Sequence, residues 1–250
     1  MAQEENRCFP AGSSQISGIE SHAAARWIIC SLLYGKREEF HLKLEHLSVR
    51  DFTEELGSAN PTPGGGSAAA LCGALGAALS AMVSRLTLGN EKYREDWQSM
   101  GAVQQTADLM TEQFLELVQR DADAYRTVIA AMKLPKKTEE DKAARHKAFQ
   151  EATKNAAKVP LETLRTSEKL IALTKEAMER GNPNTLTDAG AALQLARTAA
   201  VVAAYNVRIN LPGLQDEEFV TACKEEVEEA LERVESLFLE VAGYVEANLP

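Results

Sequence analysis

The chain has 250 residues, of which 45% are hydrophobic and 26% are charged, and its formal net charge is −10. This length allows one large domain or two small ones, each with a buried core. An acidic chain without a basic block is not expected to bind nucleic acid. The four cysteines and four histidines show neither CxxC nor paired-ligand spacing. We therefore expect no disulfide framework, no metal site and a reducing, cytoplasmic location.

The beginning of the chain differs in character from the rest. The first 47 residues are compositionally mixed, show no sustained periodicity, and contain two of the four cysteines and three of the four histidines. We expect residues 1–43 to form an irregular extension, and we hypothesise that it reflects an overlong start, with a natural beginning near Leu42. Residues 44–250 are expected to form one helical domain. The intact mass of the native protein tests the overlong start.

Almost every segment after residue 47 has the pattern of a helix. Apolar residues recur at three- and four-residue spacing, and no stretch alternates as a half-buried strand would. Ser48 is expected to cap the first helix, and Pro160 is expected to kink or split the fourth. The pattern predicts helices over about 49–56, 67–88, 96–132, 138–181, 187–206 and 216–249. The fold class is therefore all-α, a bundle of long antiparallel helices.

Residues 68–83 form the longest apolar run, and they are rich in Ala and Gly. The run is short for a membrane span, which needs about 20 residues. Small side chains allow neighbouring helices to approach closely in a bundle. We therefore interpret this run as a buried central helix and expect no association with a membrane.

The chain enters the central helix through Asn60-Pro61-Thr62-Pro63-Gly64-Gly65-Gly66-Ser67. The prolines stiffen the approach, the glycines permit backbone angles that other residues avoid, and Ser67 is a good N-cap. Such a turn presents free N–H groups to an anion or a polar ring. The alternative is a tight turn ahead of a buried helix. The pattern matches neither a P-loop nor a dinucleotide fingerprint.

Two helices carry polar residues where a bundle helix would prefer apolar ones. Asp121 and Tyr125 lie four residues apart on one face, where a carboxylate could act as a general base or stabilise a cationic substrate. The alternative is an ion pair of Asp121 with Arg120 or a neighbouring lysine on a solvated face. Asn206 and Asn210 also lie four residues apart, and they suit hydrogen bonds to a heterocycle or to the last helix carbonyls.

Two further groups flank the central helix in sequence. Asn184 is a candidate cap, and Thr187 or Asp188 opens the helix that begins near residue 187, as such residues commonly do. We also expect Asp188 near the glycine turn. The best local basic patch, which we also expect near the turn, consists of Arg85, Lys92, Tyr93 and Arg94. They could bind carboxylates of an acidic ligand, although exposed Lys and Arg are common.

Together these segments resemble the cyclodeaminase/cyclohydrolase family. That family includes the C-terminal domain of formiminotransferase-cyclodeaminase and stand-alone bacterial methenyltetrahydrofolate cyclohydrolases. The matching segments follow the family's order over about residues 44–245, and they are 49–52, 60–67, 88–93, 121–125, 134–136, 182–191 and 205–211. The resemblance implies an all-helical fold, a homodimer and a cleft for a reduced folate, with a polyglutamate tail where one is present.

The resemblance implies one of two reactions. A cyclohydrolase adds water to the amidinium carbon of 5,10-methenyltetrahydrofolate and opens the ring to 10-formyltetrahydrofolate. A cyclodeaminase closes the ring of 5-formiminotetrahydrofolate and expels ammonia. We favour the cyclohydrolase because this sequence lacks the transferase half. A folate-binding homologue without catalysis is the third alternative.

The resemblance also suggests roles for the candidate residues. A carboxylate beside the methenyl carbon stabilises its charge and takes a proton from water, and Asp121 is the first choice for this role, with Asp188 second. No metal or cofactor is expected besides the folate substrate. Contacts to the substrate are expected from Pro63, Gly64, Gly65, Gly66, Ser67, Arg85, Lys92, Tyr125, Asn184, Asn206 and Asn210.

Overall fold

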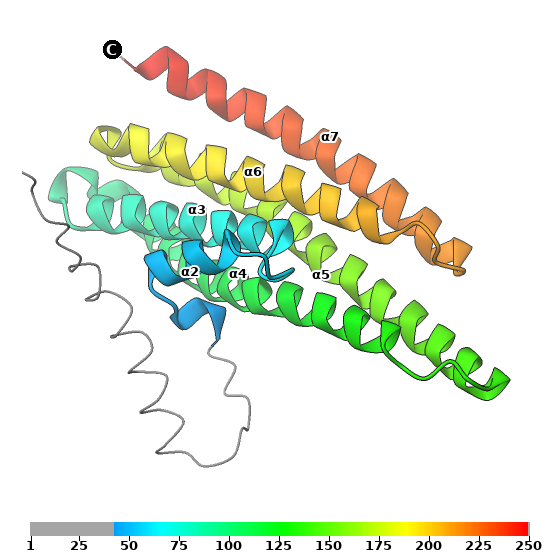
Figure 1. The fold of residues 1–250 in the computed structure, drawn as a ribbon. Helices are drawn as coiled ribbons and strands as arrows, with labels where there is room; N and C mark the ends of the chain where they lie inside the picture. Colours follow the sequence, from blue (N-terminus) through cyan, green and yellow to red (C-terminus); the bar gives the residue numbers. More distant parts are fainter. Residues whose placement is uncertain (1–42, 250) are drawn as a thin grey trace, which may run out of the picture. The chain divides into compact units, whose positions relative to one another are not determined.

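The computed structural model describes residues 43–249, so the expected extension lies outside the described residues except for Lys43. Within this range the chain forms six α-helices and no strand, which confirms the all-α bundle (Figure 1). The helices are α2 (Val49–Leu56), α3 (Gly65–Leu88), α4 (Trp97–Met132), α5 (Glu139–Arg180), α6 (Leu186–Asn210) and α7 (Glu217–Asn248). The described residues also form three short 3-10 helices. η1 (Leu44–His46) precedes α2, η2 (Glu91–Asp96) lies between α3 and α4, and η3 (Pro183–Thr185) lies between α5 and α6.

Helix α3 lies at the centre of the bundle, in contact with α4, α5 and α6. Its buried side chains are small, and Ala70, Ala77 and Ala81 are fully enclosed. A Cβ on Gly73 would lie 2.4 Å from the ring of Phe114, so the missing side chain lets α4 pack directly against α3. Small residues thus set the spacing of the central helices, which confirms a buried Ala/Gly-rich central helix.

Helix α3 is also the one helix among the described residues that is long and apolar enough to span a membrane by length and composition. Of its most apolar window, 61% is buried inside the bundle. The apolar character of α3 is therefore largely used in packing against its neighbours.

Several helix boundaries agree with the sequence patterns. Ser48 caps α2 by accepting from the Asp51 N–H, and Thr138 caps α5 in a reciprocal capping box with Asp141. The expected break at Pro160 is wrong in one respect, because α5 runs through that residue without being split. Pro160 has no N–H to donate to the carbonyl of Ala156, four residues earlier. That carbonyl instead accepts a hydrogen bond of 3.1 Å from Asn210 Nδ2 on α6.

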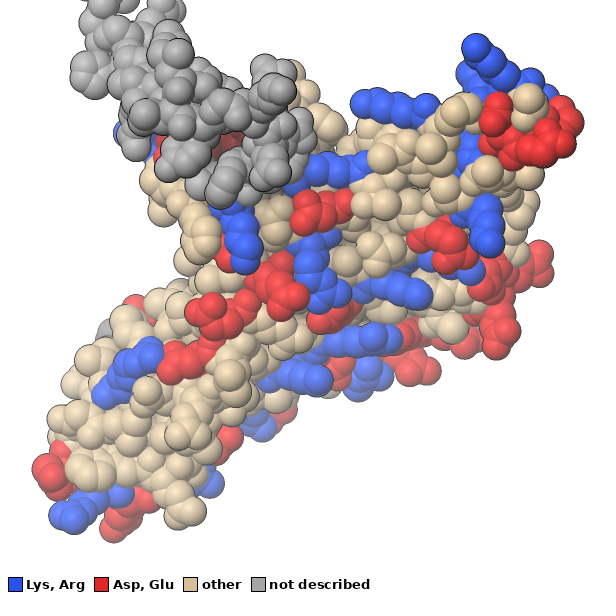
Figure 2. Space-filling view, turned by 90° about the horizontal axis from the view of Figure 1, so that it is seen from below, with Lys and Arg blue, Asp and Glu red and all other residues tan. Residues whose placement is uncertain are grey.

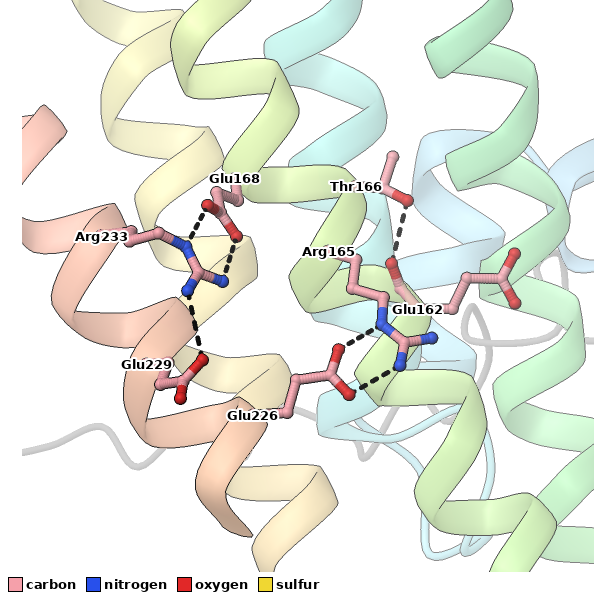
Figure 3. Close-up of polar contacts among 7 residues, drawn as sticks. All are labelled: Glu162, Arg165, Thr166, Glu168, Glu226, Glu229 and Arg233. Carbon is pink, nitrogen blue, oxygen red and sulfur yellow. Dashed lines mark hydrogen bonds and ion pairs between the residues drawn. The ribbon is translucent and has the colours of Figure 1, made fainter. Parts of the chain in front are cut away.

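Helix α7 packs along α5 and α6 through a narrow row of buried side chains that includes Val227 and Val234. Ion pairs flank this row. Figure 3 shows Arg165 of α5 paired with Glu226, and Arg233 of α7 paired with Glu168 and Glu229. Pairs this exposed contribute little each, so the buried row carries most of the attachment of α7.

The charged surface mixes both signs. On the face seen in Figure 2, basic and acidic side chains alternate along the helices rather than forming separate patches. Ion pairs between helices include Arg120 with Glu162 and Arg197 with Glu235. The net negative charge is therefore spread over the helices instead of forming one field on this face.

Candidate active site

The glycine turn meets the middle of α4 at Asp121. Ser67 Oγ donates a hydrogen bond of 2.9 Å to Asp121 Oδ2. A Cβ on Gly66 would lie only 2.1 Å from Asp121 Oδ1. The carboxylate can therefore occupy this position only because residue 66 has no side chain, so the turn and the candidate base form one structural unit.

The structure corrects two expectations about the turn. Helix α3 begins at Gly65 with Gly64 as its N-cap, so Ser67 lies inside the first turn and its hydroxyl is free to bind Asp121. The glycines do not adopt unusual backbone angles, since among the described residues only Gly213 has a positive φ. Close approach, and not backbone freedom, is thus the physical reason for Gly66. Pro63 is buried behind the turn, after a cis Thr62–Pro63 peptide bond.

The environment of Asp121 changes its acidity. Burial raises the pKa of the Asp121 carboxyl, because removal from water disfavours the charged form, while hydrogen bonds from Ser67 partly oppose the shift. The first N–H groups of α3 have no acceptor within the helix, and they lie at the positive end of its dipole. The site thus combines a carboxyl that is easier to protonate than usual with backbone donors suited to a developing negative charge.

Asn206 of α6 lies on the other side of the turn. Its Nδ2 is 3.6 Å from the position of a Cβ on Gly65, and it donates to the carbonyl of Val202 at 2.8 Å. Within residues 43–249 nothing donates to Asn206 Oδ1. Asn206 therefore retains one N–H and its oxygen for a polar ligand.

Tyr125 and Asn210 belong to the same end of the bundle. Tyr125 lies one turn after Asp121 on α4 and is 41% exposed. Asn210 donates to the carbonyls of Ala156 and Asn206 at 3.1 and 2.8 Å. Both N–H groups of Asn210 are thus used within the protein, whereas the Tyr125 side chain faces solvent.

The remaining candidate residues lie at the opposite end of the bundle, and they are Arg85, Lys92, Asn184 and Asp188. Within a single chain, the expectation that Asp188 and the basic patch lie near the glycine turn is therefore wrong. From Gly66 to Arg85 helix α3 rises ~28 Å at 1.5 Å per residue. Gly65 lies beside Asn206 and Gly76 beside Ala192, so α3 and α6 run antiparallel. This places the start of α6, and with it Asp188, at the far end of α3.

At this far end the candidate residues form a second polar group. Arg85 binds both carboxylate oxygens of Asp108 at 2.7 Å, and Lys92 is exposed with its ammonium 5.4 Å from the ring centre of Tyr93. Asp188 is partly exposed in the first turn of α6. A recess of about 170 Å³ near it is lined by Asn182, Thr185, Tyr244 and Asn248, among others.

Sequence reasoning chose the wrong asparagine in this second group. Asn182, and not Asn184, caps the short helix η3, and the N–H of exposed Asn184 donates to Asn182 Oδ1 at 3.0 Å. Asn182 Oδ1 also accepts from the Tyr93 hydroxyl at 3.1 Å. The proline at residue 183 was the available signal, because proline favours the first position of a helix and the cap directly precedes it.

Among residues 43–249, no three His, Cys, Asp or Glu side chains are grouped so that they could hold a metal ion. By their positions in the bundle, the candidate residues form two polar groups. The first contains the glycine turn, Asp121, Tyr125, Asn206 and Asn210, and the second contains Arg85, Lys92, Asn184 and Asp188.

Comparison with known proteins gives the family context. A family model described as formiminotransferase-cyclodeaminase matches residues 48–229. The chain is 38% identical over 196 residues to a methenyltetrahydrofolate cyclohydrolase from Methylorubrum extorquens, covering 78% of this chain and 91% of that protein. It is 33% identical over 201 residues to the formimidoyltransferase-cyclodeaminase of Rattus norvegicus, covering 80% of this chain but only 37% of that protein.

A solved structure shares the fold. The crystal structure of formiminotetrahydrofolate cyclodeaminase from Thermotoga maritima matches with a TM-score of 0.74 and 28% sequence identity. The match covers 82% of this chain and 98% of that one. The helical fold is thus common to the two proteins.

Proposed function

The chain belongs to the formiminotransferase-cyclodeaminase family, and we propose that it is an enzyme that hydrolyses 5,10-methenyltetrahydrofolate to 10-formyltetrahydrofolate. The observation that carries this proposal is the partly buried Asp121 carboxyl, held by Ser67 against the glycine turn. The similarity to the Methylorubrum cyclohydrolase, which spans 91% of that protein, supports the choice of reaction. No cofactor besides the folate substrate is needed for this hydrolysis.

The geometry suits the chemistry of a charged amidine. The methenyl carbon lies between N5 and N10 and carries positive charge, which the Asp121 carboxylate stabilises. As a water oxygen bonds to that carbon, Asp121 takes one of the water protons. Its raised pKa makes this transfer easier than for an exposed aspartate. Breaking the bond from N5 to the carbon leaves the formyl group on N10, N5 takes the proton from Asp121, and a second proton leaves to solvent.

The other residues of the first group supply orientation. Free N–H groups in the first turn of α3 stabilise the oxygen that develops negative charge in the tetrahedral intermediate. Asn206 offers a donor and an acceptor to the edge of the pterin ring, and Tyr125 offers an exposed aromatic face one turn from Asp121. Gly65 and Gly66 allow the folate to approach the backbone closely.

We propose that the protein acts as a homodimer in the cytoplasm. Helices α3 and α6 are adjacent, and both carry exposed apolar side chains, which include Leu75, Tyr205 and Ile209 at 50%, 58% and 74% exposure. Apolar side chains exposed on two neighbouring helices are a common feature of subunit interfaces. A second copy of this chain, with the same two faces, is the proposed occupant.

A two-fold axis perpendicular to α3 would also join the two polar groups. Such an axis makes the partner's helices antiparallel, so the second group of one subunit approaches the glycine turn of the other. The partner subunit's Asp188 would then face the substrate held by Asp121. The partner subunit's Arg85 and Lys92 would bind the carboxylates of the glutamate tail, including a polyglutamate tail.

Cyclodeaminase activity, an ammonia-lyase reaction, is the second candidate function. The observation that favours it is the match to the Thermotoga cyclodeaminase structure over 98% of that chain. A protonated Asp121 would serve this reaction as the acid for the departing ammonia, and burial raises its pKa in that direction.

One spectroscopic experiment separates the candidate functions. The purified protein is mixed with 5,10-methenyltetrahydrofolate in one cuvette and with 5-formiminotetrahydrofolate in another, and the methenyl absorbance is followed. Loss of absorbance in the first cuvette supports the hydrolase, and a rise in the second, with ammonia release, supports the deaminase. Binding without a change in either cuvette contradicts both and indicates a folate-binding protein.

A further inference from the structure

Pro160 and Asn210 form a polar contact between α5 and α6. Because proline has no N–H, the carbonyl of Ala156 has no hydrogen-bond donor at position 160 of α5. Asn210 Nδ2 donates to this carbonyl at 3.1 Å and to the carbonyl of Asn206 at 2.8 Å. Two carbonyl oxygens face the same amide nitrogen, so the orientation of the Asn210 side chain is fixed by its surroundings. This contact ties the end of α6 to one point of α5.

The same part of α5 also holds α4. Glu162, two residues after Pro160, accepts two hydrogen bonds from Arg120, at 3.1 and 2.7 Å. Arg120 directly precedes Asp121 in α4. One segment of α5, residues 156–162, therefore contacts both helices that bring polar side chains to the glycine turn. We call this segment, with Arg120 and Asn210, the α5 clamp.

We propose that Asn210 is a positioning residue, which acts through Asn206 and sets its place relative to Asp121. The inference rests on the proposed function for its effect on turnover. On α6, Asn206 lies one turn after Val202 and one turn before Asn210. Its side chain lies beside Gly65. A rotation or a slide of the α6 end would move the Asn206 amide away from the turn while leaving Asp121 and Ser67 in place. The α5 clamp prevents this movement.

Hydrogen–deuterium exchange tests the clamp without any substrate. In Asn210→Ala we expect the amides of residues 204–211 to exchange at least about fivefold faster, as the loss of a net hydrogen bond would give. Asn248→Ala is the matched control, because Asn248 makes the same bond to a carbonyl four residues earlier but forms no hydrogen bond to another described helix. The control should leave residues 204–211 unchanged. Unchanged exchange in Asn210→Ala would overturn the proposal.

A second variant tests why Asn210 is needed. Pro160→Ala supplies an N–H that can bond to the carbonyl of Ala156 within α5. We therefore expect Asn210→Ala to lower the melting temperature less in the Pro160→Ala background than in the wild type. An equal loss in both backgrounds would show that Pro160 and Asn210 are not coupled, and would contradict the clamp.

A double-mutant cycle with Asn206 tests the consequence for catalysis. We expect Asn210→Ala to lower kcat about tenfold at a temperature where the variant is folded, and to have no further effect in an Asn206→Ala background. Losses that multiply would show that Asn210 acts on substrate directly, and an unchanged kcat would show a structural role alone. Each of these results overturns the proposal.

The failure of the proposed function would be visible separately. A wild type that converts neither folate contradicts the enzymatic reaction, whereas the exchange result still decides whether the α5 clamp exists. In that case the same double-mutant cycle is measured by calorimetry with tetrahydrofolate. Non-additive losses in affinity support positioning through Asn206, and additive or absent losses overturn it.

Discussion

Gly66 and Asp121 approach so closely that a Cβ on Gly66 would lie 2.1 Å from Asp121 Oδ1. The carboxylate is also fixed by Ser67, one residue further along α3. Because the aspartate side chain is short, it cannot avoid an added methyl group and keep that hydrogen bond. The first turn of α3 and the middle of α4 therefore depend on each other for their geometry.

We predict that Gly66→Ala displaces the Asp121 carboxylate and lowers turnover at least about tenfold, with a stability cost of about 1–3 kcal/mol from overpacking. Steady-state kinetics and thermal unfolding measure the two effects. Gly101→Ala is the control, since a Cβ on Gly101 has no atom within 4 Å. Full activity in Gly66→Ala would show that the close contact with Asp121 is not needed for function.

Asp121→Asn should lower kcat at least about 100-fold while the protein stays folded, because an amide cannot accept the proton of water. Asp123→Asn is a matched control on the same helix. Asp123 is exposed and pairs with Arg126 at 2.6 Å, on a different face from Asp121. Near-normal turnover in Asp121→Asn would remove Asp121 from the mechanism.

The raised pKa of Asp121 predicts how stability depends on pH. In the unfolded chain this carboxyl titrates near 3.8, and burial raises its pKa in the folded protein. The folded protein thus binds this proton more tightly than the unfolded chain does. The stability gained in this way is fully present below the pKa of the unfolded chain, and it is lost as the pH rises through the pKa of the folded protein. At neutral pH the buried charge is therefore a cost, and Asp121→Asn should raise Tm.

Calorimetric scans of both proteins between pH 3 and pH 8 measure this effect. The gap in Tm between Asp121→Asn and the wild type should close as the pH falls below the folded pKa. The same substitution is thus expected to stabilise the protein and to inactivate it. A Tm of Asp121→Asn below that of the wild type at neutral pH would contradict the claim that the buried Asp121 carboxylate destabilises the fold.

Subunit mixing tests the proposed dimer. If each site joins Asp121 of one subunit with Asp188 of the other, then Asp121→Asn and Asp188→Asn are each inactive alone. After denaturation and refolding together, half of the dimers are mixed, and each mixed dimer contains one intact site. Activity should therefore return to about a quarter of the wild-type value. No recovery, with dimers present in sedimentation, would show that Asp188 does not complete the site of its partner.

Much of the fold follows from local patterns. Helical periodicity placed α2, α4 and α7 to within a residue of their observed ends, because caps such as Ser48 and Asp216 are local features. Periodicity also separated Asp121 from Asp123, since only the former is on the face that packs against α3.

The arrangement of the site depended on information that is not local. The antiparallel packing of α3 and α6 decides that Asp188 lies far from the glycine turn, and helix spacing within one segment carries no such information. The distance of Arg85 from the turn, by contrast, follows from the length of α3 alone. The partner of Asn210 on α5 could not be predicted for the same reason. The carbonyl of Ala156 is free to accept from Asn210 because Pro160, on a different helix from Asn210, has no N–H. The sequence patterns thus predicted the helices but not the contacts between them.

The most direct measurement is the rate at which the purified protein removes the methenyl absorbance of 5,10-methenyltetrahydrofolate, with the product identified by chromatography. We predict a rate far above the spontaneous one, 10-formyltetrahydrofolate as the product, and a loss of at least about 100-fold in Asp121→Asn. A wild-type rate no faster than spontaneous hydrolysis would contradict it.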